Sequence, residues 1–217
     1  MHFEVLIEDQ SGKTTMEILL PKIIGENHTF RIIAYKGIGR IPKDIGKNEN
    51  PGHRILLNSL PRLLKGYGQT FKGYGAENKA LLVVICDLDN KRLTEFKNEL
   101  LSLLESCSPK PETLFIFAIE EGEAWFLGDT EAVKKAYPNA KEQVLKTYVN
   151  DSICGTWEKL ADAIYNGGAK ALEKKGFHAI GEEKSKWARK ITPLMNLNKN
   201  NSPSFCYFLD KLIRIKN

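Results

Sequence analysis

Asp87 and Asp89 are the residues whose types and spacing most directly indicate chemistry. They follow an apolar run, Leu81 to Cys86, that is typical of a strand buried on both faces. Side chains alternate along an extended segment, so both carboxylates are expected to point the same way, just past the carboxyl end of the strand. Two such charges repel each other unless a cation lies between them or one takes up a proton. Oxygen ligands of this kind suit magnesium or manganese; the alternative is that Asp89 only caps the helix expected after it.

A third carboxylate, Glu8, ends the first apolar run of the chain, Phe3 to Ile7. In an open α/β sheet, ligands bind outside the carboxyl ends of the strands. If the strands that precede Glu8 and Asp87 lie side by side in a parallel sheet, three carboxylates meet at this edge. Glu8, Asp87 and Asp89 are therefore the predicted ligands of a Mg²⁺ or Mn²⁺ ion.

A second acidic cluster follows the apolar run 113–119, where Glu120, Glu121 and Glu123 occupy three of four positions. Glu123 falls in the first turn of an expected helix, where the helix dipole favours a carboxylate, and this alone would explain it. Because acids recur at three strand ends, we expect Glu120 or Glu123 to join the group around the metal.

The elements that position these acids alternate along the chain. Apolar runs predict strands, and apolar residues spaced by three and four predict helices. The expected strands are 3–8, 29–35, 81–86 and 113–119, and the expected helices that follow them are 13–24, 54–64 and 93–105. This order predicts an α/β fold with a mostly parallel sheet covered by helices on both faces.

The last third of the chain, residues 130–217, is predicted to be a helical extension of an α/β core formed by residues 1–129. Further helices are expected over 157–172, 184–195 and 205–215. We expect this C-terminal part to pack against the core.

The composition is that of a cytoplasmic globular protein. The chain has 217 residues, of which 42% are hydrophobic, enough for a core. No stretch approaches the ~20 apolar residues of a membrane span, and no secretory signal precedes the first strand. The cysteines at positions 86, 107, 154 and 206 follow no zinc-ligand pattern. We therefore expect a reduced, cytoplasmic protein that does not bind a membrane.

The net charge is +5, but basic residues are concentrated in one stretch, Arg31 to Lys72. Nine lysines and arginines in this stretch are accompanied by only two acids, Asp44 and Glu49. Aromatic and glycine residues are interleaved with them, a composition typical of nucleic-acid surfaces. A solvated, loop-rich face explains the charge equally well. His53, at the end of the long polar connection 36–53, is more simply an exposed loop residue than a catalytic one.

The acidic pattern resembles the Toprim fold of topoisomerases, primases and OLD-type nucleases. The matching segments are VLIEDQSGKTTMEILL, which contains Glu8, and LLVVICDLDN, which contains Asp87 and Asp89. Members of that family often have glycine after the glutamate, whereas Asp9 stands here. More narrowly, the chain is similar to uncharacterised Toprim-like proteins of bacteria and their mobile elements, some associated with anti-phage defence. The segments that carry this likeness are EEGEAWFLGD (120–129) and SPSF (202–205).

The resemblance implies a magnesium-dependent nuclease that acts on DNA or RNA. Asp87 and Asp89 would bind the metal, and Glu8 would be a further ligand or the general acid/base. A basic residue should also contact the scissile phosphate. The candidates lie on the helix expected over 184–195, and they are Lys186, Arg189 and Lys190.

Two alternatives to a nuclease remain open. One is a non-catalytic Toprim-like module that binds a partner protein, and the other is a nucleotidyl transferase that uses the same acids. The segment Ser11 to Thr14 ends like a P-loop, but Ile7 stands where that motif needs its first glycine. Any ATPase would therefore be encoded separately, as a partner protein.

Overall fold

A four-stranded sheet lies at the centre of the structure, a computed structural model that describes residues 1–42, 54–75 and 78–216. The strands are β1 (His2–Ile7), β2 (Thr29–Ala34), β3 (Ala80–Asp87) and β4 (Thr113–Ala118), in the spatial order β2-β1-β3-β4. All neighbouring pairs are parallel, and Ile7 lies opposite both Ala34 and Ile85. The predicted parallel sheet is confirmed, and the strands that precede Glu8 and Asp87 are neighbours.

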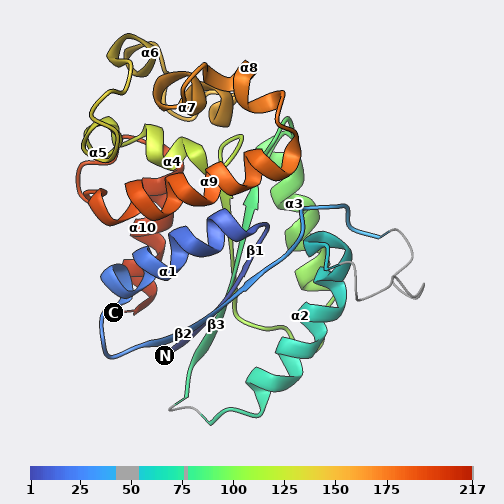
Figure 1. Cartoon of the computed structure of the whole chain (residues 1–217). Coiled ribbons are helices and arrows are strands. Elements are labelled where there is room, and N and C mark those ends of the chain that lie inside the picture. Colours follow the sequence, from blue (N-terminus) through green and yellow to red (C-terminus); the bar gives the residue numbers. More distant parts are fainter. Residues whose placement is uncertain (43–53, 76–77, 217) are drawn as a thin grey trace.

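Helices cover both faces of this sheet, as the sequence predicts (Figure 1). One face packs against α1 (Gln10–Ile24), α9 (Phe177–Ile191) and α10 (Pro203–Lys216), and the other against α2 (Leu56–Lys72) and α3 (Leu93–Glu105). The α/β fold class is therefore confirmed. In the described ranges, we find no helix whose length and apolarity would let it cross a membrane.

The central strand, β3, is buried on both faces because its side chains alternate between two cores. Val83 and Ile85 pack among residues of α1, whereas Leu82 and Val84 pack among residues of α2 and α3. Every residue from Ala80 to Cys86 is buried. An unbroken apolar run is what a strand at the centre of a covered sheet requires, and it fixes the position of Asp87, the last residue of β3.

Shorter helices follow β4 and lead to α9. They are α4 (Glu123–Leu127), α5 (Thr130–Ala136), α6 (Glu142–Lys146), α7 (Thr156–Ile164), α8 (Gly168–Glu173) and, after α9, the 3-10 turn η2 (Thr192–Leu194). The prediction of one helix over 157–172 is wrong, because Gly167 adopts a φ of 84° and separates α7 from α8. The helix predicted over 184–195 begins earlier, at Phe177, and ends at Ile191.

Aromatic side chains join the C-terminal part to the rest of the molecule. The Trp125 ring stacks on Phe208 of α10 with 5.1 Å between the ring centroids, and the Trp125 indole N–H donates to the Ser204 hydroxyl at 3.0 Å. Trp187 of α9 is fully buried in the same core. Residues before and after position 129 therefore share one core.

Helix α2 approaches the loop before β4 so closely at Gly68 that a side chain would collide there. An ideal Cβ would lie 2.0 Å from the carbonyl oxygen of Pro109. We expect Gly68→Ala to lower the free energy of unfolding by about 1–3 kcal/mol, because overpacking outweighs the gain in helix propensity. Gly66 on the same helix has open space around it, so Gly66→Ala is the matched control and should stabilise by up to ~1 kcal/mol. Equal effects of the two substitutions in urea denaturation would contradict this packing.

Candidate active site

A small cavity opens at the carboxyl ends of β1 and β3, the edge at which parallel sheets bind ligands. Its volume is about 30 Å³, enough for roughly one or two water molecules or an ion. Residues of α1, α4 and α9 complete its walls. The charged residues that line it are Glu8, Asp9, Asp87, Glu123 and Lys184. Four carboxylates and one ammonium group therefore face a single cavity.

Glu8 directly follows β1 and has an unusual environment. Burial, and then the negative charges of Asp89 and Asp9, raise the pKa of Glu8 to about 7. Its Oε2 is buried and has no hydrogen-bond partner among the described residues. A buried acceptor without a partner is costly unless a proton or a cation satisfies it. Glu8 therefore places in this cavity a carboxylate oxygen that a proton or a cation would stabilise.

Asp87 ends β3 near Glu8, because Ile7 and Ile85 are paired across the two strands. Burial raises the pKa of Asp87 well above its usual range, and the charge of Glu8 raises it further. The two carboxylates thus lie close enough to repel each other, which is the arrangement that the sequence predicts for neighbouring strand ends.

Asp89 does not continue the geometry of the strand. The expectation that Asp87 and Asp89 point the same way assumes an extended chain, but β3 ends at Asp87 and Asp89 has a φ of 49°. Its backbone N–H donates to the Glu120 carbonyl oxygen at 2.9 Å, and its carboxylate lies 3.0 Å from Lys91 Nζ. Asp89 is not among the residues that line the cavity, although its charge still raises the pKa of Glu8.

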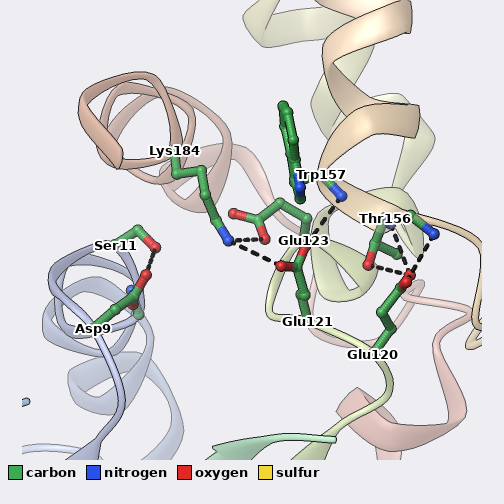
Figure 2. A network of polar contacts seen from close by, with 10 residues as sticks. Asp9, Ser11, Glu120, Glu121, Glu123, Thr156, Trp157 and Lys184 are labelled. Atoms are coloured by element: carbon green, nitrogen blue, oxygen red, sulfur yellow. Dashed lines mark hydrogen bonds and ion pairs between the residues drawn. The ribbon is translucent and has the colours of Figure 1, made fainter. Parts of the chain in front are cut away.

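Lys184 and Asp9 are the charged residues of this cavity that sequence reasoning missed, and Lys184 is the cation among them. Its Nζ lies 3.0 Å from Glu123 Oε2 and 3.6 Å from Glu121 Oε1 (Figure 2). Burial alone would lower the pKa of Lys184, but the surrounding carboxylates, Glu123 first, outweigh burial and raise it. The sequence did contain a signal, because Lys184 precedes the buried Trp187 and Ile191 by three and seven residues. It therefore lies on the apolar stripe of α9.

Glu123 and Glu121 are the acidic partners in this ion-pair network. Glu123 is 2% exposed, and burial raises its pKa while Lys184 opposes the rise. Burial also raises the pKa of Glu121, to about 7. Glu121 Oε2 accepts a hydrogen bond from the backbone N–H of Trp157 at 3.3 Å. The structure therefore brings Glu123 to the cavity, where its partner is a lysine.

Glu120 lies outside the cavity and holds another element. Its carboxylate accepts hydrogen bonds of 2.7–3.1 Å from the backbone N–H groups of residues 154–156 and from the Thr156 hydroxyl (Figure 2). Burial would raise the pKa of Glu120, but these hydrogen bonds, that of the Thr156 hydroxyl first, outweigh burial and lower it. Glu120 therefore fixes the N-terminus of α7, and the structure does not bring it to the other acids.

The basic residues predicted to contact phosphate lie on the outer side of α9. Lys190 is exposed, and its Nζ lies 5.2 Å from the centre of the Tyr137 ring. Lys186 is exposed and forms an ion pair with Glu183, and Arg189 is also exposed. Helix α9 therefore turns these three side chains away from the cavity and Lys184 toward it.

The chemistry of the cavity suits a hard divalent cation, although its ligand atoms are not gathered around one point. Glu8 and Asp87 supply carboxylate oxygens. Within residues 1–42, 54–75 and 78–216, no three His, Cys, Asp or Glu side chains form a ready metal-binding group. The Asp89 carboxylate is bound by Lys91 and would have to turn toward Glu8. Glu8 and Asp87, joined by Asp89 after this turn, are the residues that would hold Mg²⁺ or Mn²⁺.

Comparison with known proteins places the chain in a family. No curated protein and no solved structure matches it. One family model, described as Domain of unknown function (DUF4276), matches residues 7–213, a range that contains Glu8, Asp87 and Lys184. The chain therefore belongs to the DUF4276 family.

Proposed function

We propose that this protein is a metal-dependent nuclease that hydrolyses phosphodiester bonds in DNA or RNA. The observation that carries the proposal is Glu8, whose buried Oε2 has no hydrogen-bond partner in the described structure. Glu8 and Asp87 are both half-buried at the ligand-binding edge of a parallel sheet, and both have raised pKa values. A cation would remove their repulsion and satisfy the unpaired oxygen, so the site favours one. The resemblance to Toprim nucleases implies a metal site at the same two residues, Glu8 and Asp87.

Four residues in and beside the cavity have a role in this proposal. A bound Mg²⁺ or Mn²⁺ would supply a polarised water and neutralise charge on the leaving oxygen. Asp87 and Asp89 would hold the ion, and Glu8 would either complete the ligand set or act as the general base. Lys184 supplies fixed positive charge on the α9 side of the cavity, where it would stabilise a phosphate oxygen.

A role in anti-phage defence, together with a separate ATPase, is part of the proposal through the resemblance. The turn after β1 is built as a helix cap and not as a nucleotide-binding loop. Asp9 Oδ1 accepts a hydrogen bond from the Gly12 N–H at 2.7 Å, and Asp9 Oδ2 accepts one from the Ser11 hydroxyl at 2.7 Å.

One observation favours a second candidate function, a non-catalytic module that binds a partner protein. Lys184 already forms ion pairs with Glu121 and Glu123, so these two carboxylates have a cation beside them without a metal. Such a buried ion-pair network is also what a purely structural site would contain. In that case metal ions would neither stabilise the protein nor activate it.

The nuclease is tested with plasmid DNA, single-stranded DNA and total RNA in Mg²⁺ or Mn²⁺. We expect the wild type to cleave at least one polymer, and Asp87→Asn and Glu8→Gln each to slow cleavage by about 100-fold or more, because each removes a ligand of the cation. Asp210→Asn is the matched control, since Asp210 is an exposed acid on α10 that pairs with Arg214. Cleavage that survives both cavity substitutions, or no cleavage of any polymer, would overturn the nuclease and favour the partner-binding module.

A further inference from the structure

Exposed basic residues cover the region around β2 and α2, and we refer to them as the α2 basic surface. They are Lys36, Arg40, Arg54, Arg62, Lys65 and Lys72. The described residues between positions 29 and 75, namely 29–42 and 54–75, contain no Asp or Glu. Lys43, Lys47 and His53, and the acids Asp44 and Glu49, lie outside the described residues. A surface with one sign of charge attracts polyanions.

On α2 the basic side chains form a single stripe. Arg62, Lys65 and Lys72 are separated by three and seven residues, which places them on one side of the helix. Helix α2 contains no acidic residue, and no carboxylate of the described residues forms an ion pair with these three side chains. The eleven residues from Arg62 to Lys72 span about 15 Å of helix, long enough to follow several phosphates of one strand.

The α2 basic surface begins at the same edge of the sheet as the cavity lined by Glu8, Asp9, Asp87, Glu123 and Lys184, which we call the acid cavity. The Gly37 N–H donates to the Glu8 carbonyl oxygen at 3.1 Å, and the Gly37 carbonyl oxygen accepts from the Leu56 N–H at 3.1 Å. Gly37 therefore joins the residue after β1 to the first residue of α2, and Lys36 precedes this junction. From here α2 runs back toward the amino ends of the strands (Figure 1), so the stripe leads away from Glu8.

The aromatic residues of this region do not form a platform for stacking bases. Tyr67, Phe71 and Tyr74 lie against one another, with 5.5 and 5.7 Å between successive ring centroids. Tyr67 and Phe71 are half-buried, and Tyr74 alone of the three is exposed. A further cation of the region, Arg31, is bound by Glu4 at 2.7 Å. Exposed cations without a row of exposed rings are suited to phosphates and not to bases.

We propose that the α2 basic surface binds the sugar–phosphate backbone of the substrate and leads it to the acid cavity without reading its bases. This inference rests on the proposed nuclease function and specifies how the polymer is recognised. Phosphates lie along Arg62, Lys65 and Lys72, and the strand passes Lys36 to reach Glu8. DNA and RNA share this backbone chemistry, so the test compares them.

The test measures binding by fluorescence anisotropy, with the full chain in EDTA so that cleavage does not interfere. The probes are labelled DNA and RNA of unrelated sequences, single-stranded and duplex. The stripe variant is Arg62→Gln/Lys65→Gln/Lys72→Gln, and its control, Lys135→Gln/Lys141→Gln/Lys199→Gln, removes the same charge from exposed lysines elsewhere. We expect the stripe variant to bind about tenfold or more weakly than the wild type, and the control to bind within about twofold of the wild type. The slope of log K against log salt concentration should be smaller in magnitude by about 2–3 for the stripe variant.

Several outcomes would overturn this proposal. They are equal losses in the two variants, affinities that differ more than about tenfold between unrelated sequences, and stronger binding to phosphatidylserine vesicles than to nucleic acid. The experiments distinguish failure of the proposed binding surface from failure of the proposed nuclease activity, because binding is measured without metal. Stripe-dependent binding that no metal converts into cleavage overturns the nuclease alone, whereas metal-dependent cleavage with unchanged binding by the stripe variant overturns the surface alone.

Discussion

Replacement of Lys184 by methionine is expected to lower the free energy of unfolding by about 3–5 kcal/mol near pH 8, because it leaves buried carboxylates without their counter-charge. Glu123 lies 3.0 Å from Lys184 Nζ and is buried, and Glu121 lies 3.6 Å away. Glu121 has a pKa of about 7 even beside the lysine, and loss of the lysine raises it further. The carboxylates of the variant therefore take up protons as the pH falls, and urea denaturation should show a smaller deficit near pH 5.

Two companion variants separate this charge effect from a packing effect. In Lys184→Met/Glu123→Gln the unpaired carboxylate is removed, so part of the lost stability should return. Lys190→Met changes an exposed lysine of the same helix and should cost less than about 1 kcal/mol, the scale of its contact with Tyr137. A deficit in Lys184→Met that is the same at both pH values would show that the methionine disturbs packing and that the ion pairs contribute little.

Replacement of Glu8 by glutamine is expected to stabilise the metal-free protein. In the folded state the pKa of Glu8 is about 7, above its usual value of 4.5. The stability associated with its proton is fully present below pH 4.5 and is lost as the pH rises through 7. At pH 8, the ionised Glu8 carboxylate lowers the free energy of unfolding of the wild type by about 3 kcal/mol. The uncharged glutamine does not have this effect. Urea denaturation in EDTA should therefore show a gain for Glu8→Gln that is largest near pH 8 and disappears toward pH 4.

The same substitution should abolish stabilisation by metal. A ligand at 100 times its dissociation constant stabilises the folded state by about 2.7 kcal/mol, so Mg²⁺ or Mn²⁺ should raise the melting temperature of the wild type and leave that of Glu8→Gln unchanged. Glu99→Gln, at an exposed acid of α3, should behave like the wild type in both experiments. If metal stabilises the wild type and Glu8→Gln equally, Glu8 is not a metal ligand.

The positions of Glu8 and Asp87 can be predicted from the sequence because each directly follows or ends a buried parallel strand, and such strands leave an unbroken apolar run. Asp89 and Glu120 cannot be placed in this way. Both have positive φ angles, 49° and 61°, so the alternation of side chains along the preceding strand does not extend to them. The directions of the Asp89 and Glu120 side chains are set by partners far along the chain or across the turn. The periodicity of the sequence carries no information about these partners.

Lys184 illustrates a different limit. A helix predicted to start at 184 places this lysine at a solvent-exposed end, whereas the helix that starts at Phe177 places it in the middle of a buried stripe. Helix ends are set by weak local preferences, so an error of a few residues is enough to hide a functional side chain. The apolar stripe that contains a lysine was the more reliable signal.

The ion pairs of Lys184 have a consequence for how this protein can change over evolution. Glu8, Asp87 and Glu123 come from the first 129 residues, and the cation that balances the charge of their cavity comes from the last third of the chain. A recombination event that exchanged the sequence after Asp129 would remove Lys184 and leave the carboxylates of this cavity without that cation. We therefore expect the two segments to be inherited as one unit, with a charge lost in one of them matched by a change in the other.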